Sequence, residues 1–295
     1  MNKEELQYLD LLNNILQNGS KKEDRTGVGT IGIFGTQLRF SLKGNTLPLL
    51  TTKKMFTRGI IEELLFFIRG ETNTKKLEEK GVNIWKGNTS RQFLDSRKLS
   101  HLPEGSLGRG YGYQWRNFGG KEPPWDYHRN RKNNDGVDQL SNALNLIKNE
   151  PNSRKIIVSA WNPQQLSDMA LEPCHMMFQF YVNDGELSLQ WYQRSVDSFL
   201  GLPFNITSYA ILTKIMAQAA GLKCGELVFC GGDTHIYNNH IDSVKTQLLR
   251  DPYLFPKLYL DKEISTIEDM EKLQFEDFRI ENYNHHPAIS AQMAV

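Results

Sequence analysis

Residues 176–192 constrain the fold of this chain more than any other segment. Residues 176–182 are mostly of strand-forming types, residues 183–185 read Asn-Asp-Gly, and apolar side chains alternate with polar or amphipathic ones from residue 187 to residue 192. Asn, Asp and Gly tolerate the positive φ angles of tight hairpin turns, and alternation is typical of a strand. The segment therefore predicts two antiparallel strands joined by a tight turn.

Apolar residues at helical spacing occur on both sides of this hairpin. Between Leu6 and Ile15 they lie three apart and are followed by Gly19, which is typical of a helix that a glycine ends. A single core can grow to about 250–300 residues, and no repeat or composition break interrupts the 295 residues. We therefore predict an α+β fold and a single domain over residues 1–295. Further helices are expected over residues 59–68, 137–147, 209–220 and 241–248.

Residues 27–32 read Gly-Val-Gly-Thr-Ile-Gly and match the dinucleotide-binding fingerprint G-x-G-x-x-G. In such a site the phosphate lies at the N-terminus of the helix that follows the glycines. Here the glycines follow a predicted helix and lead into the strand-like run 33–42. We therefore do not interpret them as a dinucleotide site.

Charge and cysteine content argue against several classes of protein. Lys plus Arg number 35 against 34 Asp plus Glu, a net charge of +1 that favours neither nucleic acid nor an anionic membrane. The longest mostly apolar stretch, 59–68, is far shorter than the roughly 20 residues of a membrane span. Three cysteines are an odd number, which suits a reducing compartment. We expect a cytoplasmic protein that binds neither nucleic acid nor membrane.

Cys174 is the cysteine best placed for chemistry. It stands between Pro173 and His175, just before a predicted strand. A nucleophilic thiolate needs a rigid position and a cationic or polar neighbour that lowers its pKa, and His175 or a nearby arginine could provide one. The alternative is a small buried apolar side chain, which is our interpretation of Cys224 and Cys230.

Four longer motifs resemble a known family. They read Met-Ala-Leu-Glu-Pro-Cys-His at 169–175, Gln-Arg-Ser-Val-Asp at 193–197, Leu-Pro-Phe-Asn-Ile-Thr-Ser-Tyr at 202–209 and Gly-Asp-Thr-His-Ile-Tyr at 232–237. In this order they resemble the thymidylate synthase family, and the resemblance extends from residues 24–27 to residues 293–295. It implies that family's α+β fold, a homodimer packed through sheet faces, and two active sites shared between the subunits.

The resemblance also implies a reaction, the conversion of dUMP to dTMP. The family's cysteine, matched by Cys174, adds to C6 of the uracil ring. The reduced folate 5,10-methylenetetrahydrofolate, a cosubstrate, supplies the one-carbon unit and the hydride and leaves as dihydrofolate. No metal is expected, since the adjacent pair His285-His286 lacks further ligands at metal spacing. The other implied catalytic residues are Glu63, Tyr111, Arg194, Asp197 and Asn205.

Two neighbouring glutamates compete for the role of buried acid. Glu63 shares a helix face with Ile60, Leu64 and Phe67, where burial raises a carboxyl pKa and suits proton transfer. Glu62 also has apolar neighbours, so periodicity does not choose between them. The resemblance selects Glu63 as the proton-relay acid near O4 of uracil.

The resemblance assigns the dUMP phosphate to Arg25, Arg194 and Ser195, with a basic pair from the partner subunit. That pair matches Arg154-Lys155, where the family normally has two arginines. A guanidinium donates two parallel charge-assisted bonds to a phosphate, whereas lysine keeps the charge without that geometry. Arg154 is therefore the firmer assignment of the pair.

Asn205 is expected to select the base, because an amide can accept from N3–H and donate to O4 of uracil. The alternative is a cap for a helix that begins near Ser208. Asp233, His235 and Tyr237 alternate and so face one side of an extended segment. His235 and Tyr237 match contacts to the ribose 3′-hydroxyl. The remaining assignments are Gln193 and Asp197 to dUMP, and Trp85, Asn88, Asp197 and Val295 to the folate.

Residues 107–115 contain a departure from the family pattern. Arg109-Gly110 stands where the family typically has Pro-Val, directly before Tyr111. The resemblance places Tyr111 near the proton that leaves C5 of uracil. The departure makes this loop less rigid and adds a charge to it.

Two other functions compete with this interpretation. A pyrimidine nucleotide hydroxymethylase of the same superfamily would add water in place of hydride; Asn205 argues against a dCMP version, and the Ala-Val end at 294–295 favours a site that excludes water. A catalytically silent nucleotide- or RNA-binding protein is the second alternative. The presence of Cys174, Glu63 and Arg194 argues against it, as does the balanced charge.

Overall fold

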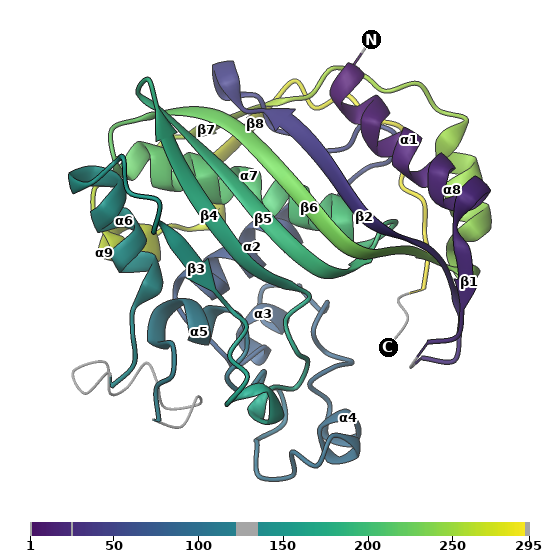
Figure 1. Cartoon of the computed structure of the whole chain (residues 1–295), viewed down its shortest axis with the longest axis horizontal. Helices are drawn as coiled ribbons and strands as arrows, with labels where there is room; N and C mark the ends of the chain where they lie inside the picture. Colours follow the sequence, from purple (N-terminus) through teal and green to yellow (C-terminus); the bar gives the residue numbers. More distant parts are fainter. Residues whose placement is uncertain (1, 25, 122–134, 293–295) are drawn as a thin grey trace.

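The computed structural model describes residues 2–24, 26–121 and 135–292 and has the expected α+β architecture (Figure 1). The α-helices are α1 (Lys3–Asn18), α2 (Thr57–Ile68), α3 (Lys75–Glu78), α4 (Arg91–Ser96), α5 (Gly112–Asn117), α6 (Gln139–Asn149), α7 (Gly201–Ala219), α8 (Ile241–Leu248) and α9 (Ile267–Glu271). The strands are β1 (Ser20–Lys22), β2 (Thr30–Ser41), β3 (Ile157–Ser159), β4 (His175–Asn183), β5 (Glu186–Asp197), β6 (Lys223–Tyr237), β7 (Lys257–Leu260) and β8 (Phe278–Glu281).

The main sheet has six strands in the order β1-β2-β6-β5-β4-β3, and β7 pairs with β8 separately. Neighbours in the main sheet are antiparallel except β5 and β6, which run parallel. The predicted hairpin is confirmed as β4 and β5. Asp184 and Gly185 at its turn have φ angles of 49° and 73°, as a two-residue hairpin turn with two positive φ angles requires. The glycine-rich segment 27–32 leads into β2, so the argument against a dinucleotide site holds.

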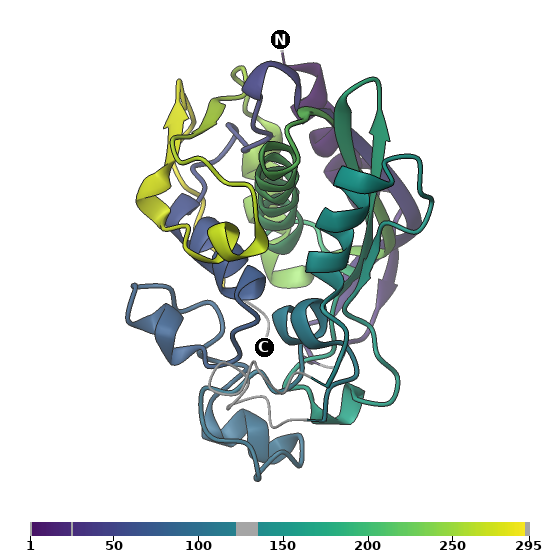
Figure 2. The ribbon, with the colours of Figure 1, turned by 90° about the vertical axis from the view of Figure 1, so that its left-hand side faces the viewer.

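Helix α7 runs behind the sheet and forms the centre of the core (Figure 2). It packs on β5 and β6 on one side and on α2 on the other. It begins at Gly201, eight residues before the expected start, because Pro203 falls in the first turn, where its missing N–H costs nothing. Helix α2 is buried nearly all round, as predicted for residues 59–68. None of the helices in the described ranges is both long and apolar enough to cross a membrane.

The expected helix over 137–147 is confirmed as α6, except at its first residue. Asp138 caps α6 by accepting a hydrogen bond from the main-chain N–H of Ser141. Val137 precedes this cap, is 50 % exposed, and pairs with Phe118 in an isolated bridge. Its apolar side chain therefore does not belong to the helical stripe.

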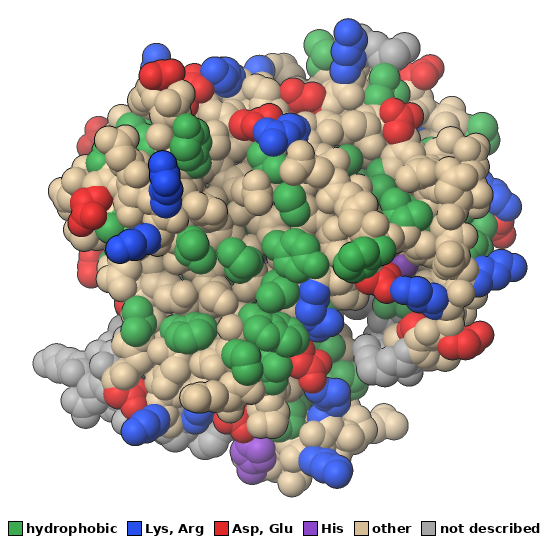
Figure 3. Space-filling model, viewed as in Figure 1, with side chains coloured by type: hydrophobic (Ala, Val, Ile, Leu, Met, Phe, Trp, Pro, Cys, Tyr) green, Lys and Arg blue, Asp and Glu red, His purple; other side chains and the backbone are tan. Residues whose placement is uncertain are grey.

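The described part of the chain leaves open the face of the sheet opposite α7, and Figures 1 and 3 view this face directly. On β4, Phe178 and Phe180 point into the core, so Gln179 and Tyr181 point to this open face. Tyr181 is 63 % exposed, and Figure 3 shows apolar side chains spread across the face. A broad, partly apolar face of this kind is typical of a surface that another protein covers.

Candidate active site

The main chain of Cys174 is held on both sides, directly before β4. Its N–H donates to the phenolic oxygen of Tyr111 at 2.9 Å, and its carbonyl accepts from the main-chain N–H of Arg194 at 2.9 Å. The side chain is half-buried. These contacts give the thiol the rigid position that a nucleophile requires.

Arg194 is the cation beside this thiol. Its Nε donates to the carbonyl of Pro173 at 2.9 Å and its Nη2 to the carbonyl of Glu172 at 3.0 Å, so the guanidinium lies against the segment that leads into Cys174. Burial lowers the pKa of His175 to about 3, and its Nδ1 is 2.8 Å from the hydroxyl of Tyr209. His175 is therefore neutral near pH 7. Of the two candidates for a cationic neighbour, the structure favours the arginine.

The structure separates the two glutamates of α2. The Glu62 carboxylate accepts from Lys80 Nζ at 2.6 Å, in an ion pair between a buried carboxylate and a partly exposed lysine. The Glu63 carboxylate accepts from Trp85 Nε1 at 2.7 Å. Burial raises the pKa of Glu63 to about 7, against the lowering effect of the Trp85 bond. Glu63 is thus poised to hold or release a proton near neutral pH, and Glu62 is a structural ion-pair partner.

Replacing Glu63 with glutamine is expected to stabilise the protein at alkaline pH. The Glu63 carboxyl has a pKa of about 7 in the folded state against an ordinary 4.5, so the folded state binds more protons between these values. Stability of the wild type therefore falls as the pH rises through this window. Glutamine does not titrate. The stability advantage of Glu63→Gln over the wild type should grow by roughly 2–3 kcal/mol between about pH 5 and about pH 8 in urea unfolding. An advantage that is equal at both pH values would contradict the raised pKa.

Tyr111 reaches Cys174 from a strained turn. Its φ of 37° is positive, and its ring stacks on Phe67 at a centroid distance of 5.0 Å. Arg109, the departure from the family pattern, donates from Nη1 to the carbonyl of Gly120 at 3.3 Å and from Nη2 to that of Lys121 at 3.1 Å. The arginine therefore adds contacts that fasten the loop, where the sequence predicted only reduced rigidity.

Asp197 and Asn205 come together at the start of α7. A Cβ atom on Gly201 would lie 3.4 Å from Asp197 Cβ and 4.0 Å from Asn205 Oδ1, so the two side chains flank this glycine. Asp197 Oδ1 accepts from the main-chain N–H groups of Phe199 and Leu200 at 3.0 and 3.1 Å. Because α7 begins at Gly201, Asn205 lies inside the helix. The alternative that it caps a helix starting near residue 208 is wrong.

The ends of β5 and β6 bring further expected site residues side by side. Ser195 pairs with Asp233, and Asp197 pairs with His235. The His235 Nδ1 lies 3.1 Å from Asp233 Oδ1, and the ring of Tyr237 packs against that of His235 at 5.2 Å. The expected alternation of these residues on one extended segment is confirmed. Gln193 lies two residues before Ser195 on β5 and is buried, and its Nε2 donates to the carbonyl of Ser195 at 3.2 Å.

The other expected residues divide into three groups. Trp85 bonds Glu63, and the buried Asn88 follows it in the same segment. Arg154 and Lys155 are exposed and lie just before β3. The Arg154 carbonyl accepts from Gln179 Nε2 on β4, and Gln179 is five residues after Cys174 in the chain. The structure does not bring them to the site of their own chain. Arg25 and Val295 lie outside the described residues.

Lys53 lies close to the site although the sequence did not single it out. It is 4 % exposed, its Nζ donates to the carbonyl of Phe199, and the same atom lies 3.6 Å above the Phe199 ring. Burial lowers the pKa of Lys53 to about 7, and the negative charge of Asp197 opposes this shift. The sequence Thr-Thr-Lys-Lys at 51–54 is polar and typical of an exposed segment, so only the fold reveals that Lys53 is buried.

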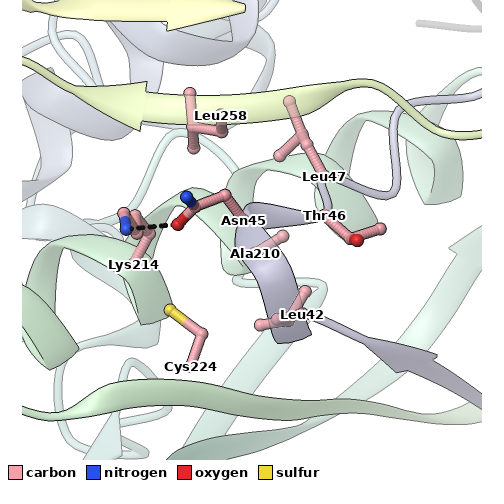
Figure 4. A pocket seen from close by; sticks show the side chains of 8 residues that line it. All are labelled: Leu42, Asn45, Thr46, Leu47, Ala210, Lys214, Cys224 and Leu258. Carbon is pink, nitrogen blue, oxygen red and sulfur yellow. Dashed lines mark hydrogen bonds between the residues drawn. The ribbon is translucent and has the colours of Figure 1, made fainter.

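A cavity of about 10 Å³ lies at the opposite end of β5 and β6, where Leu187 pairs with Cys224 (Figure 4). Lys214 donates to Asn45 Oδ1 across it at 2.8 Å, and the positive charge of Lys214 opposes the raising effect of burial on the pKa of Cys224. It holds no residue of the expected site. Within the described ranges, no three or more His, Cys, Asp and Glu side chains are grouped to hold a metal ion.

Known proteins that are similar to this chain share one family. Residues 6–295 match the family model described as thymidylate synthase. The chain is 52 % identical to the bifunctional dihydrofolate reductase-thymidylate synthase of Leishmania major and 52 % identical to that of Plasmodium berghei (strain Anka), over 100 % and 99 % of its own length. It spans about half of these relatives, 56 % and 49 % respectively. It is also 50 % identical to thymidylate synthase 1/2 of Encephalitozoon cuniculi (strain GB-M1), covering 98 % of the chain and 97 % of that protein. The chain therefore belongs to the thymidylate synthase family.

Proposed function

We propose that the protein is a thymidylate synthase that converts dUMP to dTMP with 5,10-methylenetetrahydrofolate and releases dihydrofolate. The observation that carries the proposal is the fixed position of Cys174 between the Tyr111 hydroxyl and the Arg194 main chain, with the Arg194 guanidinium alongside. Such a thiol can form a covalent bond to an electrophilic ring carbon. When bound, the folate supplies the one-carbon unit and the hydride.

Each nearby side chain has a role in this reaction. The Cys174 thiolate adds to C6 of uracil, which makes C5 nucleophilic. Glu63, with its pKa near 7, exchanges a proton with the O4 side of the ring. Burial raises the pKa of Tyr111 well above its ordinary value, so its hydroxyl stays neutral and can relay the proton leaving C5 by giving up its own proton as it takes up that one. The half-buried thiol and buried acid favour hydride transfer over the addition of water, against the hydroxymethylase alternative.

The proposed ligand contacts are those that the family resemblance implies. Arg194 and Ser195 bind the phosphate with Arg25, while His235 and Tyr237 bind the 3′-hydroxyl. The proposed set is completed by Gln193, Asp197 and Asn205 for dUMP, and by Trp85, Asn88, Asp197 and Val295 for the folate.

We further propose a homodimer that forms through the open face of the sheet. Arg194 alternates along β5 with the buried Trp191 and Gln193, so it lies on the same side as Gln190 and Tyr192, toward this face. A second chain packed there can bring its Arg154 and Lys155 to the phosphate site. At about 3.3 Å per residue, the separation of five residues from Cys174 to Gln179 puts Arg154 roughly 16 Å from its own site.

Three cysteines, an odd number that cannot form a complete set of disulfides, support a cytoplasmic location. The apolar core, which joins residues from α1 to β8, supports a single domain over residues 1–295.

The direct test is an assay of dUMP and methylenetetrahydrofolate that follows both dihydrofolate and the nucleotide product. Equal amounts of dihydrofolate and dTMP are expected. Hydroxymethylated nucleotide without dihydrofolate would establish the hydroxymethylase alternative. Binding of dUMP without any turnover would establish the silent nucleotide-binding alternative.

Replacing Asn205 with aspartate is expected to shift preference from dUMP toward dCMP. A protonated carboxyl matches the donor and acceptor pattern of cytosine, whereas the amide matches that of uracil. The ratio of kcat/KM for dCMP to that for dUMP should rise at least about tenfold. Asn88→Asp, the same change on the folate side, should leave the ratio unaltered. A ratio that Asn205→Asp does not change would show that Asn205 does not select the base.

A further inference from the structure

The segment that contains α4 packs beside the main chain that leads into Cys174. A small buried cluster, separate from the main core, joins the two segments and consists of Leu94, Leu99, Leu102 and Ala170. Arg97 follows directly after the last residue of α4. Its guanidinium donates to the carboxylate of Glu172, two residues before Cys174. None of the roles assigned above uses this ion pair.

The main chain beside this ion pair also holds Arg194. Nη2 of Arg194 donates to the Glu172 carbonyl at 3.0 Å, and its Nε donates to the carbonyl of Pro173 at 2.9 Å. The guanidinium carbon lies 5.3 Å from the centre of the Trp161 ring. Among the described residues, Arg194 therefore contacts neutral groups and forms no ion pair. Its positive charge remains available to an anion.

The Glu172 carboxylate is ionised and interacts with two guanidinium groups. Burial raises the pKa of Glu172, but its own main-chain N–H, the bond from Arg97 and the charges of Arg97 and Arg194 together lower it below its ordinary value. Of the two guanidinium groups, the carboxylate bonds that of Arg97. A carboxylate that turned to Arg194 would compete with a phosphate, because both bind a guanidinium through a pair of oxygens.

The ion pair contributes little to holding the two segments together. Both side chains are 31 % exposed, and ion pairs that water reaches add little to the stability of a fold. The buried leucine cluster already joins the segments. The main consequence of the ion pair is therefore electrostatic, because it cancels a negative charge near Arg194.

We propose that Arg97 is a positioning residue for the phosphate site, because it neutralises the Glu172 carboxylate and keeps it away from Arg194. The anion is the 5′-phosphate of dUMP, so this inference rests on the proposed function. The role requires no contact of Arg97 or Glu172 with the nucleotide. Without Arg97, the carboxylate repels the phosphate and competes with it for Arg194. Without Glu172, the charge of Arg97 adds to the attraction that the phosphate experiences.

Removing one charge of the pair at a time tests this role, with the dissociation constant for dUMP measured by calorimetry. Arg97→Gln should raise this constant roughly three- to tenfold at low ionic strength, the scale on which one unit charge acts on a nearby dianion through water. Glu172→Gln should lower it by about two- to fivefold for the same reason. The double variant should lie within about twofold of the wild type, because the two effects cancel. Both single shifts should shrink at high salt.

Arg279 and Asp261 provide matched controls. They form an ion pair at 2.8 Å beside β7 and β8, at the opposite end of the molecule from α4 (Figure 1). Arg279→Gln and Asp261→Asn change the net charge of the protein by the same amounts as the two test substitutions. Each control should leave the dissociation constant for dUMP within about twofold of the wild type, because water and salt screen distant charges.

The signs of the shifts distinguish an electrostatic role from a structural one. Weaker dUMP binding in both single variants, with no recovery in the double variant, would show that the ion pair only supports the local fold and would overturn the inference. Unchanged dissociation constants in both single variants would also overturn it. Calorimetry requires no turnover. The expected pattern in a protein that makes no dihydrofolate would therefore overturn the proposed reaction and leave the role of Arg97 in place.

Discussion

Replacing Cys174 with serine is expected to reduce dUMP turnover at least about a thousandfold while leaving the dissociation constant for dUMP within a few-fold of the wild type. An alcohol is a far weaker nucleophile than a thiolate near neutral pH, yet it fills nearly the same space. Two main-chain bonds hold residue 174: its N–H donates to the Tyr111 hydroxyl, and its carbonyl accepts from the Arg194 N–H. Neither bond involves the side chain. The measurement is dihydrofolate formation, with dUMP binding followed separately by calorimetry.

Cys224 and Cys230 provide the matched controls. Each is half-buried, and the paired residues of β5 and β6 place Cys224 at the end of the sheet away from Asp197. Burial raises the pKa of Cys224, which makes it a poor thiolate. Serine at either position should keep substantial activity. Near-normal turnover in Cys174→Ser, or a complete loss in Cys224→Ser, would show that the nucleophile has been misassigned.

Local sequence predicted the hairpin of β4 and β5, the strand-like run that lies in β2, and the longer helices, because their signals are short-range. The alternation around residues 183–185 and the apolar face of residues 59–68 depend only on strand and helix periodicity. The start of α7 could not be predicted this way. Pro203 and the polar Asn205 resemble a loop, and the helix there is favoured by packing of α7 against α2 and the sheet, which periodicity does not contain.

The candidate site shows the same division. Periodicity left Glu62 and Glu63 equivalent. The structure distinguishes them, because Glu62 bonds Lys80 and Glu63 bonds Trp85. The local sequence suggested His175 as the activating cation, but burial keeps its ring neutral. Whether a histidine or lysine is buried depends on segments distant in sequence. For this reason Lys53, which is buried near Asp197, carried no signal in the sequence.

Arg154→Ala and Cys174→Ser, each nearly inactive alone, are expected to restore activity when their subunits are mixed. Arg154→Ala should lower kcat/KM roughly ten- to a hundredfold or more, because a phosphate that loses a charge-assisted partner loses about 1.5–3 kcal/mol of binding. Cys174→Ser is inactive for a separate, chemical reason. If Arg154 acts across the interface, a mixed dimer has one site with both lesions and one site with neither. Dihydrofolate formation is measured after conditions that exchange subunits, with a tag on one variant to quantify the mixed dimers.

The size of the recovery distinguishes a shared site from a site within one chain. Random exchange makes about half of the dimers mixed, and each has one intact site of two, so activity should rise toward about a quarter of the wild-type level. If Arg154 served its own chain, every site would carry a lesion and mixing would restore nothing. The five residues of β4 that separate Arg154 from Cys174, and the position of Arg194 toward the open face, favour the shared site. Mixed dimers confirmed by the tag that show no recovery of dihydrofolate formation would refute the shared site. The same result would refute the proposal that packing through the open face of the sheet brings Arg154 to the phosphate of the partner's site.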